Sequence, residues 1–219
     1  MDTMQAIRER HSVRAYTTKQ IESEKRAKLN ELAKICSLQG GIRIRMRYDD
    51  SKGFDSAMAH YGKFKNVHNY MILSGKKSDD LEERCGYYGE KMVLEAQKLG
   101  LNTCWVALTF NKHAVKKMIP SEETLVIVIA VGYGEDQGMM HKGKSVQDVT
   151  VSKGVMPDWF YQGAQAAVLA PTALNQQKFC IGIKDGEPVI RISGFGFYTK
   201  IDLGIVKYHF EAASGRKVR

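Results

Sequence analysis

Two guanidinium groups and a hydroxyl near the amino end are the first residues whose types and spacing could do chemistry. Arg10 and Arg14 stand four residues apart in the 219-residue chain, and Ser12 lies between them. A guanidinium group donates hydrogen bonds in a planar fork that fits a phosphate group, and a hydroxyl adds another donor. The three residues are therefore suited to a phosphorylated ligand, but taken alone they fit the following alternative better. The alternative is a solvated helix end, where positive side chains interact favourably with the helix dipole.

A second candidate group lies in the last quarter of the chain, at Pro171, Thr172, Ala173 and Asn175. Threonine and asparagine carry short polar side chains that can be oriented for hydrogen bonding, and proline restricts the backbone. Such a corner can hold a flat ligand with polar edges. The alternative is an ordinary loop between a helix and a strand.

No side-chain motif for catalysis or metal binding accompanies these two groups. The sequence contains no GxGxxG fingerprint, P-loop or HExxH motif, and Gly194-x-Gly196 lacks the third glycine. His11 and Ser12 are adjacent in the sequence and do not suggest a catalytic triad. The four cysteines include no CxxC pair and are interpreted as buried thiols. We therefore predict neither a metal site nor a catalytic side chain.

Helix and strand patterns must position the candidate residues. Apolar residues recur at helical spacing over 81–99, and Gly100 follows where a left-handed helix end is expected. The continuous apolar run 125–131 is typical of a strand buried on both faces. The mixture predicts an α+β (mixed α/β) fold class. Further helices are expected at about residues 3–10, 18–40, 111–118, 157–170 and 199–210, and further strands at 42–48, 70–74, 103–107, 179–183 and 188–192.

Polar residues predict where some of these elements begin. Thr17 or Thr18 is expected to cap the second helix, and Thr199 with Asp202 the last one. The polar stretch 135–153 has the composition of a loop.

Three segments of the chain together resemble the FMN-dependent nitroreductase family. Residues 10–16 (RHSVRAY) are similar to its amino-terminal R-x-S-x-R-x-aromatic signature, and residues 89–106 to its central helix and LGLGTCW-like strand. Residues 170–179 (APTALNQQKF) are similar to its APS-x-x-N-x-Q element. The resemblance implies a nitroreductase-like fold with a central, mostly antiparallel sheet flanked by helices. It also implies bound FMN and ping-pong transfer of electrons from NAD(P)H to a nitroaromatic, quinone or similar small-molecule acceptor.

The resemblance also implies which residues contact FMN, while the flavin N5 carries the chemistry. Ala107 and Leu108 depart from the pattern, because many relatives have glycines there. The added side chains narrow the space for nicotinamide or substrate, which keeps a non-catalytic FMN-binding or sensor protein as the alternative function. The implied cofactor-binding residues are Arg10, His11, Ser12, Arg14, Val106, Ala107, Leu108, Lys142, Lys144, Pro171, Thr172, Ala173 and Asn175.

The order of the segments also departs from the family pattern. The APS-like element usually follows the second helix, whereas here it comes in the last quarter of the chain. The usual family builds each FMN site from two identical subunits. The relocation predicts a single-chain pseudo-dimer with one FMN, whose halves are about residues 1–110 and 111–219; a homodimer is the alternative.

The formal net charge of +9 favours anionic partners. Arg43, Arg45 and Arg47 form a row on one face of the strand predicted at 42–48, which motivates a third interpretation, a basic nucleic-acid-binding domain. No aromatic residues interleave with the row, and we rank this interpretation last. No early apolar stretch follows Met1 and no apolar run reaches membrane-spanning length, so a cytoplasmic protein without membrane partners is expected.

Overall fold

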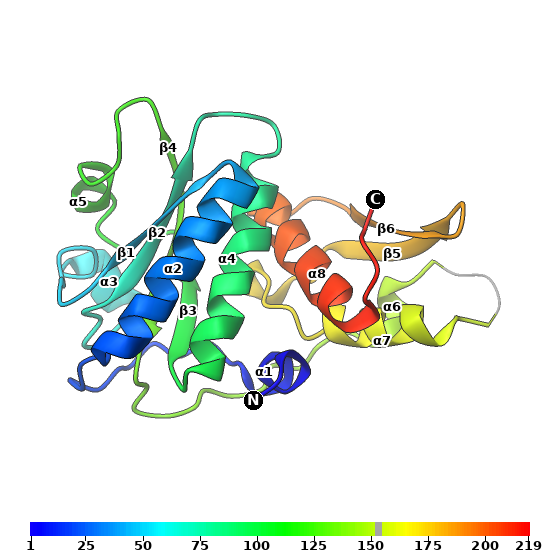
Figure 1. Cartoon of the computed structure of the whole chain (residues 1–219), viewed down its shortest axis with the longest axis horizontal. Coiled ribbons are helices and arrows are strands. Elements are labelled where there is room, and N and C mark those ends of the chain that lie inside the picture. Colours follow the sequence, from blue (N-terminus) through cyan, green and yellow to red (C-terminus); the bar gives the residue numbers. More distant parts are fainter. Residues whose placement is uncertain (152–154) are drawn as a thin grey trace. The chain divides into compact units, whose positions relative to one another are not determined.

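The structure is a computed structural model that describes residues 1–151 and 155–219, and these form two compact units (Figure 1). The sheet unit comprises Arg10–Leu81 and Lys91–Met140. The hairpin unit comprises Met1–Glu9, Glu82–Glu90 and His141–Arg219. Because both units draw on separated stretches of sequence, their boundaries differ from the halves 1–110 and 111–219.

A four-stranded antiparallel sheet with the order β1-β2-β4-β3 forms the centre of the sheet unit. Strand β4 pairs with both β2 and β3, and its residues from Ile127 onward are buried. The apolar run 125–131 is therefore the central strand that the sequence predicts. The strands are β1 (Arg43–Arg47), β2 (Tyr70–Gly75), β3 (Asn102–Val106) and β4 (Thr124–Gly132).

Helix α2 (Ser23–Gly40) packs against β1 and crosses the face of this sheet (Figure 1). Its apolar stripe is buried, and Gly41 ends it in the left-handed conformation. The predicted cap at Thr17 or Thr18 is wrong, because the backbone N–H of Thr17 donates to the Tyr133 carbonyl and keeps this segment extended. The helix begins only after Glu22. The smaller helices of this unit are α3 (Ala57–Tyr61) and α5 (Lys112–Lys116).

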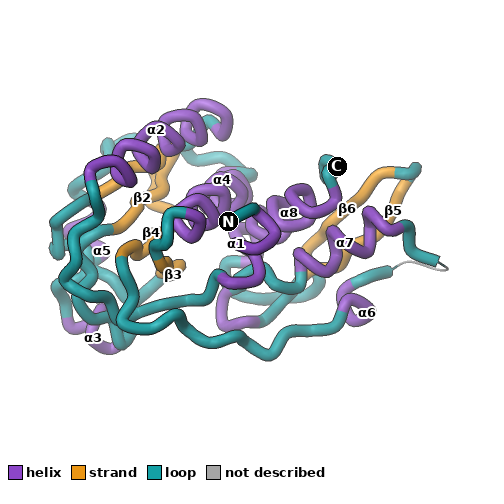
Figure 2. The backbone as a smooth tube through the Cα atoms, turned by 60° about the horizontal axis from the view of Figure 1, so that its bottom comes forward, coloured by secondary structure: helices purple, strands orange, loops and turns teal. Residues whose placement is uncertain are grey.

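The hairpin unit contains the predicted strand pair β5 (Phe179–Lys184) and β6 (Glu187–Ile192), which lies beside helix α8 (Figure 2). Asp185 and Gly186 both have positive φ, as a tight two-residue hairpin turn requires. The helices of this unit are α1 (Thr3–Glu9), α6 (Val146–Val149), α7 (Asp158–Ala167) and α8 (Thr199–Ser214).

Two expectations for the hairpin unit need correction. Helix α6 interrupts the stretch 135–153 expected as a loop, because Ser145 and Asp148 form a reciprocal capping box; residues 152 and 153 lie outside the described residues. Helix α7 begins after Pro157, as expected, but ends at Ala167 rather than near Ala170.

Helix α4 (Leu81–Lys98) contributes its first half to the hairpin unit, where it crosses α8 in backbone contact. A Cβ atom at Gly204 would overlap the carbonyl oxygen of Glu83, and one at Gly86 would overlap that of Ile201. The close approach therefore requires glycine at both positions. One turn further along α4, the Glu90 carboxylate lies 2.8 Å from Nε2 of His209 on α8, and both side chains are fully buried.

Candidate functional site

The amino-terminal signature, residues 10–16, is an extended segment held by backbone hydrogen bonds inside the sheet unit. Val13 N–H donates to the carbonyl of Thr103 on β3, and Tyr16 N–H donates to that of Lys65. The Tyr16 hydroxyl also donates to the Val13 carbonyl at 2.7 Å. These contacts fix the segment against the strand that carries the TCW sequence of the second motif.

Three predicted residues gather around the thiol of Cys104 on β3, and we call Arg10, Ser12 and Arg14 the arginine cluster. Burial raises the pKa of this thiol, while the charge of Arg14, a hydrogen bond from Ser12 and the charge of Arg10 oppose the rise. Arg10 is only 3% exposed, so it is not a solvated helix end. Arg14 is exposed and available to a ligand in solution. The cluster concentrates positive charge and a hydroxyl, which suits a phosphate group.

His11 lies beside the arginine cluster and is half-buried. Burial, followed by the positive charge of Arg10, lowers its pKa, so the neutral imidazole is favoured at pH 7. Gly138, at a φ of +73°, leaves no room for a side chain next to the His11 Cβ. His11 can therefore donate one hydrogen bond and accept another without adding charge.

Val106, Ala107 and Leu108 occupy the end of β3 and the bend that follows. Val106 is buried in the sheet opposite Val128, and Ala107 is half-buried. Leu108 is 65% exposed. The side chain that replaces the family glycine at this position thus points away from the core of the sheet unit.

The other predicted residues lie in the hairpin unit, in residues 170–177, which we call the Pro171 corner. Leu174, Asn175 and Gln177 adopt left-handed backbone conformations, with φ of 53°, 52° and 45°. Such conformations cost non-glycine residues about 1–3 kcal/mol each, so neighbouring groups must hold the corner in shape.

Gln177 fixes the far end of the corner through its buried side chain. Its Nε2 donates to the Val168 carbonyl at 2.9 Å, and its Oε1 accepts from the Lys144 backbone N–H at 2.6 Å. Its own N–H donates to the Thr172 hydroxyl at 3.1 Å. The Thr172 side chain therefore shapes the corner as well as being available to a ligand.

The two predicted lysines lie against the same corner. The Lys144 ammonium donates to the Gln177 carbonyl at 2.9 Å, and the Asn175 side chain donates to the Lys142 carbonyl at 2.9 Å. Lys142 has an exposed side chain. The stretch 142–144 thus supplies support to the corner and positive charge next to it.

Asp202 on α8 is a corner residue that the sequence interpretation assigned to a different task. The predicted cap at Thr199 and Asp202 is wrong: the helix begins after Tyr198 without a side-chain cap. Instead, the Asp202 carboxylate accepts from the Ala173 N–H at 2.9 Å and from the Gln176 side chain at 2.8 Å. One feature of the sequence could have indicated that Asp202 points inward. It lies four residues before Val206, which is buried, and residues at this spacing share one face of a helix.

Asp202 is 6% exposed, and burial raises its pKa from 3.8 to about 6 against the effect of the two hydrogen bonds. The carboxylate is thus largely ionised at pH 7 in an environment that disfavours charge. Among the described residues, no group of three or more His, Cys, Asp or Glu side chains is placed to hold a metal ion.

Comparison with known proteins identifies the family. A family model described as "Putative TM nitroreductase" matches residues 2–214. The chain belongs to this nitroreductase family. The resemblance of the three motifs is thereby confirmed, and so is the expected α+β nitroreductase-like fold with its antiparallel sheet and flanking helices.

Solved nitroreductase-type structures share this fold. A putative nitroreductase from Thermotoga maritima MSB8 has 20% identity and a TM-score of 0.70, with 97% of this chain and 83% of that one covered. A putative nitroreductase in complex with FMN from Desulfovibrio desulfuricans has 20% identity and a TM-score of 0.57, covering 71% and 98%. A putative NADH oxidase from Clostridium acetobutylicum has 22% identity and a TM-score of 0.53, covering 68% and 99%. No curated protein matches the chain.

Membership of the nitroreductase family assigns the chain to oxidoreductases in general terms. The two residue groups that carry the family motifs are the arginine cluster in the sheet unit and the Pro171 corner in the hairpin unit. Within the part of the chain that the structure describes, no helix has the length and apolarity that a membrane crossing needs.

Proposed function

We propose that this member of the nitroreductase family binds FMN and uses it to transfer electrons from NAD(P)H to a nitroaromatic, quinone or similar acceptor. The observation that carries the proposal is the arginine cluster, in which Arg10, Ser12 and Arg14 meet beside Cys104 on β3. The family match and the FMN complex of the Desulfovibrio desulfuricans relative support the choice of ligand. The name of the Clostridium acetobutylicum relative, an NADH oxidase, supports the choice of electron donor.

The residues of each unit suit different parts of FMN. In the sheet unit, Arg10 and Arg14 would hold the phosphate with Ser12, and His11 would contact the ribityl chain or the ring edge. Val106, Ala107 and Leu108 would offer their backbone to the ring. In the hairpin unit, Pro171, Thr172, Ala173 and Asn175 would contact the ring and ribityl chain, with Lys142 and Lys144 adding positive charge.

Bound FMN would supply the electron chemistry, and the chain would bind, orient and stabilise charge. Arg10 and Arg14 would balance the negative charge of the phosphate, and a buried guanidinium such as Arg10 acts more strongly on a nearby charge than one in water. A neutral His11 would orient the cofactor without competing for its negative charge.

A non-catalytic FMN-binding or sensor protein is the second candidate, favoured by Ala107 and Leu108 in place of glycines. The exposed Leu108 side chain would narrow access for nicotinamide or substrate if it lay over the ring. The nucleic-acid interpretation has less support, because Arg43 forms an ion pair with Glu123 and Arg47 with Asp50. These carboxylates neutralise much of the arginine row on β1.

A visible spectrum of the purified protein tests the proposal. Bound flavin absorption is expected, followed by bleaching when NADH or NADPH is added without oxygen. A yellow protein that neither nucleotide bleaches would favour the binding or sensor protein. A colourless protein that does not take up added FMN would contradict flavin binding altogether.

Arg14→Ala tests the arginine cluster directly. Loss of a bidentate guanidinium–phosphate contact is expected to weaken FMN binding by about 2 kcal/mol, or about 30-fold, measured by quenching of FMN fluorescence. Riboflavin lacks the phosphate, so its binding should change little. The exposed Arg191 on β6 provides a matched control, because Arg191→Ala removes the same charge elsewhere. Equal FMN affinity in Arg14→Ala and the unmodified protein would remove Arg14 from the site.

The single-chain pseudo-dimer with one FMN is also part of the proposal. The mass in solution, measured by light scattering, together with the molar ratio of FMN to chain, tests it. A monomer with one FMN supports the pseudo-dimer. A homodimer that loses FMN when it dissociates would instead indicate a site completed by a second chain.

A further inference from the structure

The buried carboxylate of Asp202 lies at the start of α8, and both of its oxygens accept hydrogen bonds from the Pro171 corner. One oxygen accepts from the Ala173 backbone N–H at 2.9 Å. The other accepts from the side chain of Gln176 at 2.8 Å. Both donors therefore come from the segment that carries the proposed ring and ribityl contacts, and α8 contributes the acceptor.

Retaining a carboxylate in this place is costly for the fold. Burial of a charged group away from water is unfavourable, and the carboxylate is mostly ionised at pH 7. An apolar residue at this position would avoid that cost but would leave the Ala173 N–H and the Gln176 side chain without this acceptor. An ionised oxygen pair does offer stronger hydrogen bonds to N–H donors than a neutral group does. This combination indicates that the geometry of the donors matters more at this position than stability does.

The donors belong to a segment that cannot keep its shape alone. The left-handed residues Leu174 and Asn175 lie between Ala173 and Gln176, the two residues that Asp202 holds. Gln177 and Lys144 secure the far end of the corner. Asp202 secures its near end, and the strained residues are fixed between the two attachments.

The same carboxylate reaches a second loop through Gln176. Besides bonding to Asp202, the Gln176 side chain donates to the Phe197 carbonyl at 2.6 Å. A Cβ atom at Gly196 would overlap the Gln176 Oε1, so the loop approaches Gln176 closely. The backbone of the loop that carries the exposed Phe195 and Phe197 is thereby joined to the corner.

We infer that Asp202 is a positioning residue that holds the Pro171 corner in the one conformation able to contact the ring and ribityl chain of FMN. The inference rests on the proposed function, and it assigns Asp202 no contact with the cofactor. If the binding-competent corner is populated only in part, the apparent dissociation constant rises in inverse proportion to that population. Removing the carboxylate should therefore weaken flavin binding without removing any flavin ligand.

The test compares flavin binding in Asp202→Ala and Asp202→Asn with the unmodified protein, using both FMN and riboflavin as ligands. Asp202→Ala removes both acceptors and should weaken binding of the two flavins by the same factor, about tenfold. Asp202→Asn keeps one oxygen for the Ala173 N–H but places an NH2 group against Gln176, so its effect should be smaller. Glu211→Gln, which changes a carboxylate to an amide on the same helix, is the matched control and should leave both affinities unchanged.

Two further measurements separate positioning from a general loss of structure. The visible circular dichroism of bound flavin should change in the Asp202 variants, because a corner held differently alters the surroundings of the ring. Hydrogen exchange at the Ala173 amide, measured without flavin, should be clearly faster in Asp202→Ala and slightly faster in Asp202→Asn, whose neutral oxygen is a weaker acceptor, while exchange in β4 stays the same. If Asp202→Ala does not fold, the circular dichroism and hydrogen exchange of Asp202→Asn still test the inference.

Equal loss of FMN and riboflavin affinity, with faster exchange at Ala173, supports the inference. Unchanged affinities and spectra in folded Asp202 variants would overturn it and leave the proposed function standing. Failure of the unmodified protein to bind either flavin would overturn the proposed function, and the inference with it.

Discussion

The sheet unit buries apolar side chains on both faces of β2 and β4, and its buried guanidinium, Arg10, stays charged. The hairpin unit instead buries two carboxyl groups and an imidazole, those of Glu90, Asp202 and His209. Apolar packing tolerates changes of pH but responds strongly to lost volume. Buried ionisable groups respond to protonation and to removal of a partner. The two units are therefore expected to lose stability for different reasons.

The largest effect is expected from the Glu90–His209 pair in the hairpin unit. His209 Nδ1 lies 3.0 Å from the Ala166 carbonyl, which can only accept, so Nδ1 must carry a proton. The bond between Nε2 and Glu90 then contains one proton, whichever residue holds it. Glu90→Ala should lower the free energy of unfolding by about 3–5 kcal/mol, because it leaves a buried imidazole without this partner.

Glu90→Gln is the matched variant for this pair. Its side-chain NH2 can donate to Nε2 of a neutral His209, so urea unfolding should show a much smaller loss. Equal losses in Glu90→Ala and Glu90→Gln would mean that packing, and not the shared proton, stabilises the contact.

The sheet unit should show a comparable effect of a different origin. Ile129 in β4 is fully buried, and Ile129→Ala leaves a cavity in place of the removed methyl and methylene groups. We expect a loss of about 3 kcal/mol at every pH between 5 and 8, and about 1 kcal/mol for Ile129→Val. If the loss of unfolding free energy in Ile129→Ala depended strongly on pH, the stability of the sheet unit would not rest on apolar packing alone.

Asp202 should make the stability of the hairpin unit depend on pH. Its pKa is about 6 when folded and near 3.8 when unfolded, so the folded state favours the protonated form. Its contribution is therefore fully present below about pH 4 and is lost as the pH rises through 6, by about 3 kcal/mol in total. Thermal unfolding of Asp202→Asn across this range should lack that decrease. An identical dependence of stability on pH in Asp202→Asn and the unmodified protein would show that Asp202 does not cause the decrease.

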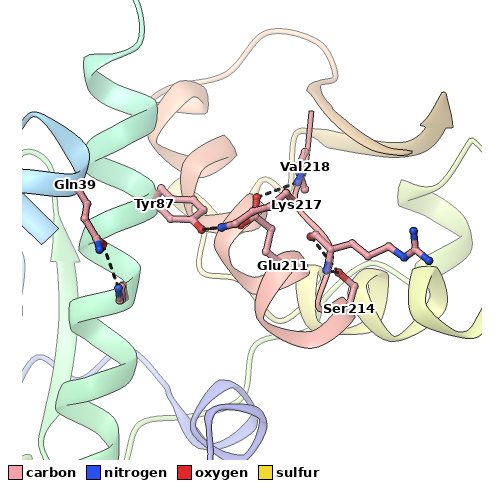
Figure 3. A network of polar contacts seen from close by, with 8 residues as sticks. Gln39, Tyr87, Glu211, Ser214, Lys217 and Val218 are labelled. Carbon is pink, nitrogen blue, oxygen red and sulfur yellow. Dashed lines mark hydrogen bonds and ion pairs between the residues drawn. The ribbon is translucent and has the colours of Figure 1, made fainter. Parts of the chain in front are cut away.

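The smallest effect is expected where the carboxyl-terminal segment meets α8 and α4 in the hairpin unit (Figure 3). The Tyr87 hydroxyl donates to Glu211 at 2.6 Å, and the Lys217 ammonium contacts both groups. Tyr87→Phe should lower the free energy of unfolding by about 1 kcal/mol in urea, because Glu211 still accepts from Lys217 and from the Val218 N–H. A loss as large as that of Glu90→Ala would show that this surface network is less solvated than its exposed lysine indicates.

Much of the fold could be predicted because its signals are local. The central strand, the β5–β6 hairpin and helix α4 follow from apolar period, turn residues and Gly100 within single segments of sequence. The start of α2 could not be predicted, since the backbone contact between Thr17 and Tyr133 joins residues far apart in the chain. Local capping preferences give no information about such a contact.

The residues of the candidate site likewise fall into those with a local sequence signal and those that depend on distant contacts. Arg10, Ser12 and Arg14 could be named because their spacing lies within one short segment. The support of the Pro171 corner could not, because Lys144 and Asp202 reach it from about 30 residues away on either side and one of them looked like a helix cap. Motifs therefore indicated candidate ligands, while the groups that shape the ligand-bearing backbone became visible only in three dimensions.

The glycine contact between α4 and α8 limits how this chain can vary. Gly204 lies two residues after Asp202 on the same helix, and the space at Gly204 and Gly86 ends at a peptide carbonyl rather than at a side chain that could move aside. Even the single methyl group of an alanine at either position would force the axes of α4 and α8 apart. Variants with any other residue at Gly86 or Gly204 are therefore expected to be unstable. Substitutions on the exposed surface of α8 do not meet this obstacle.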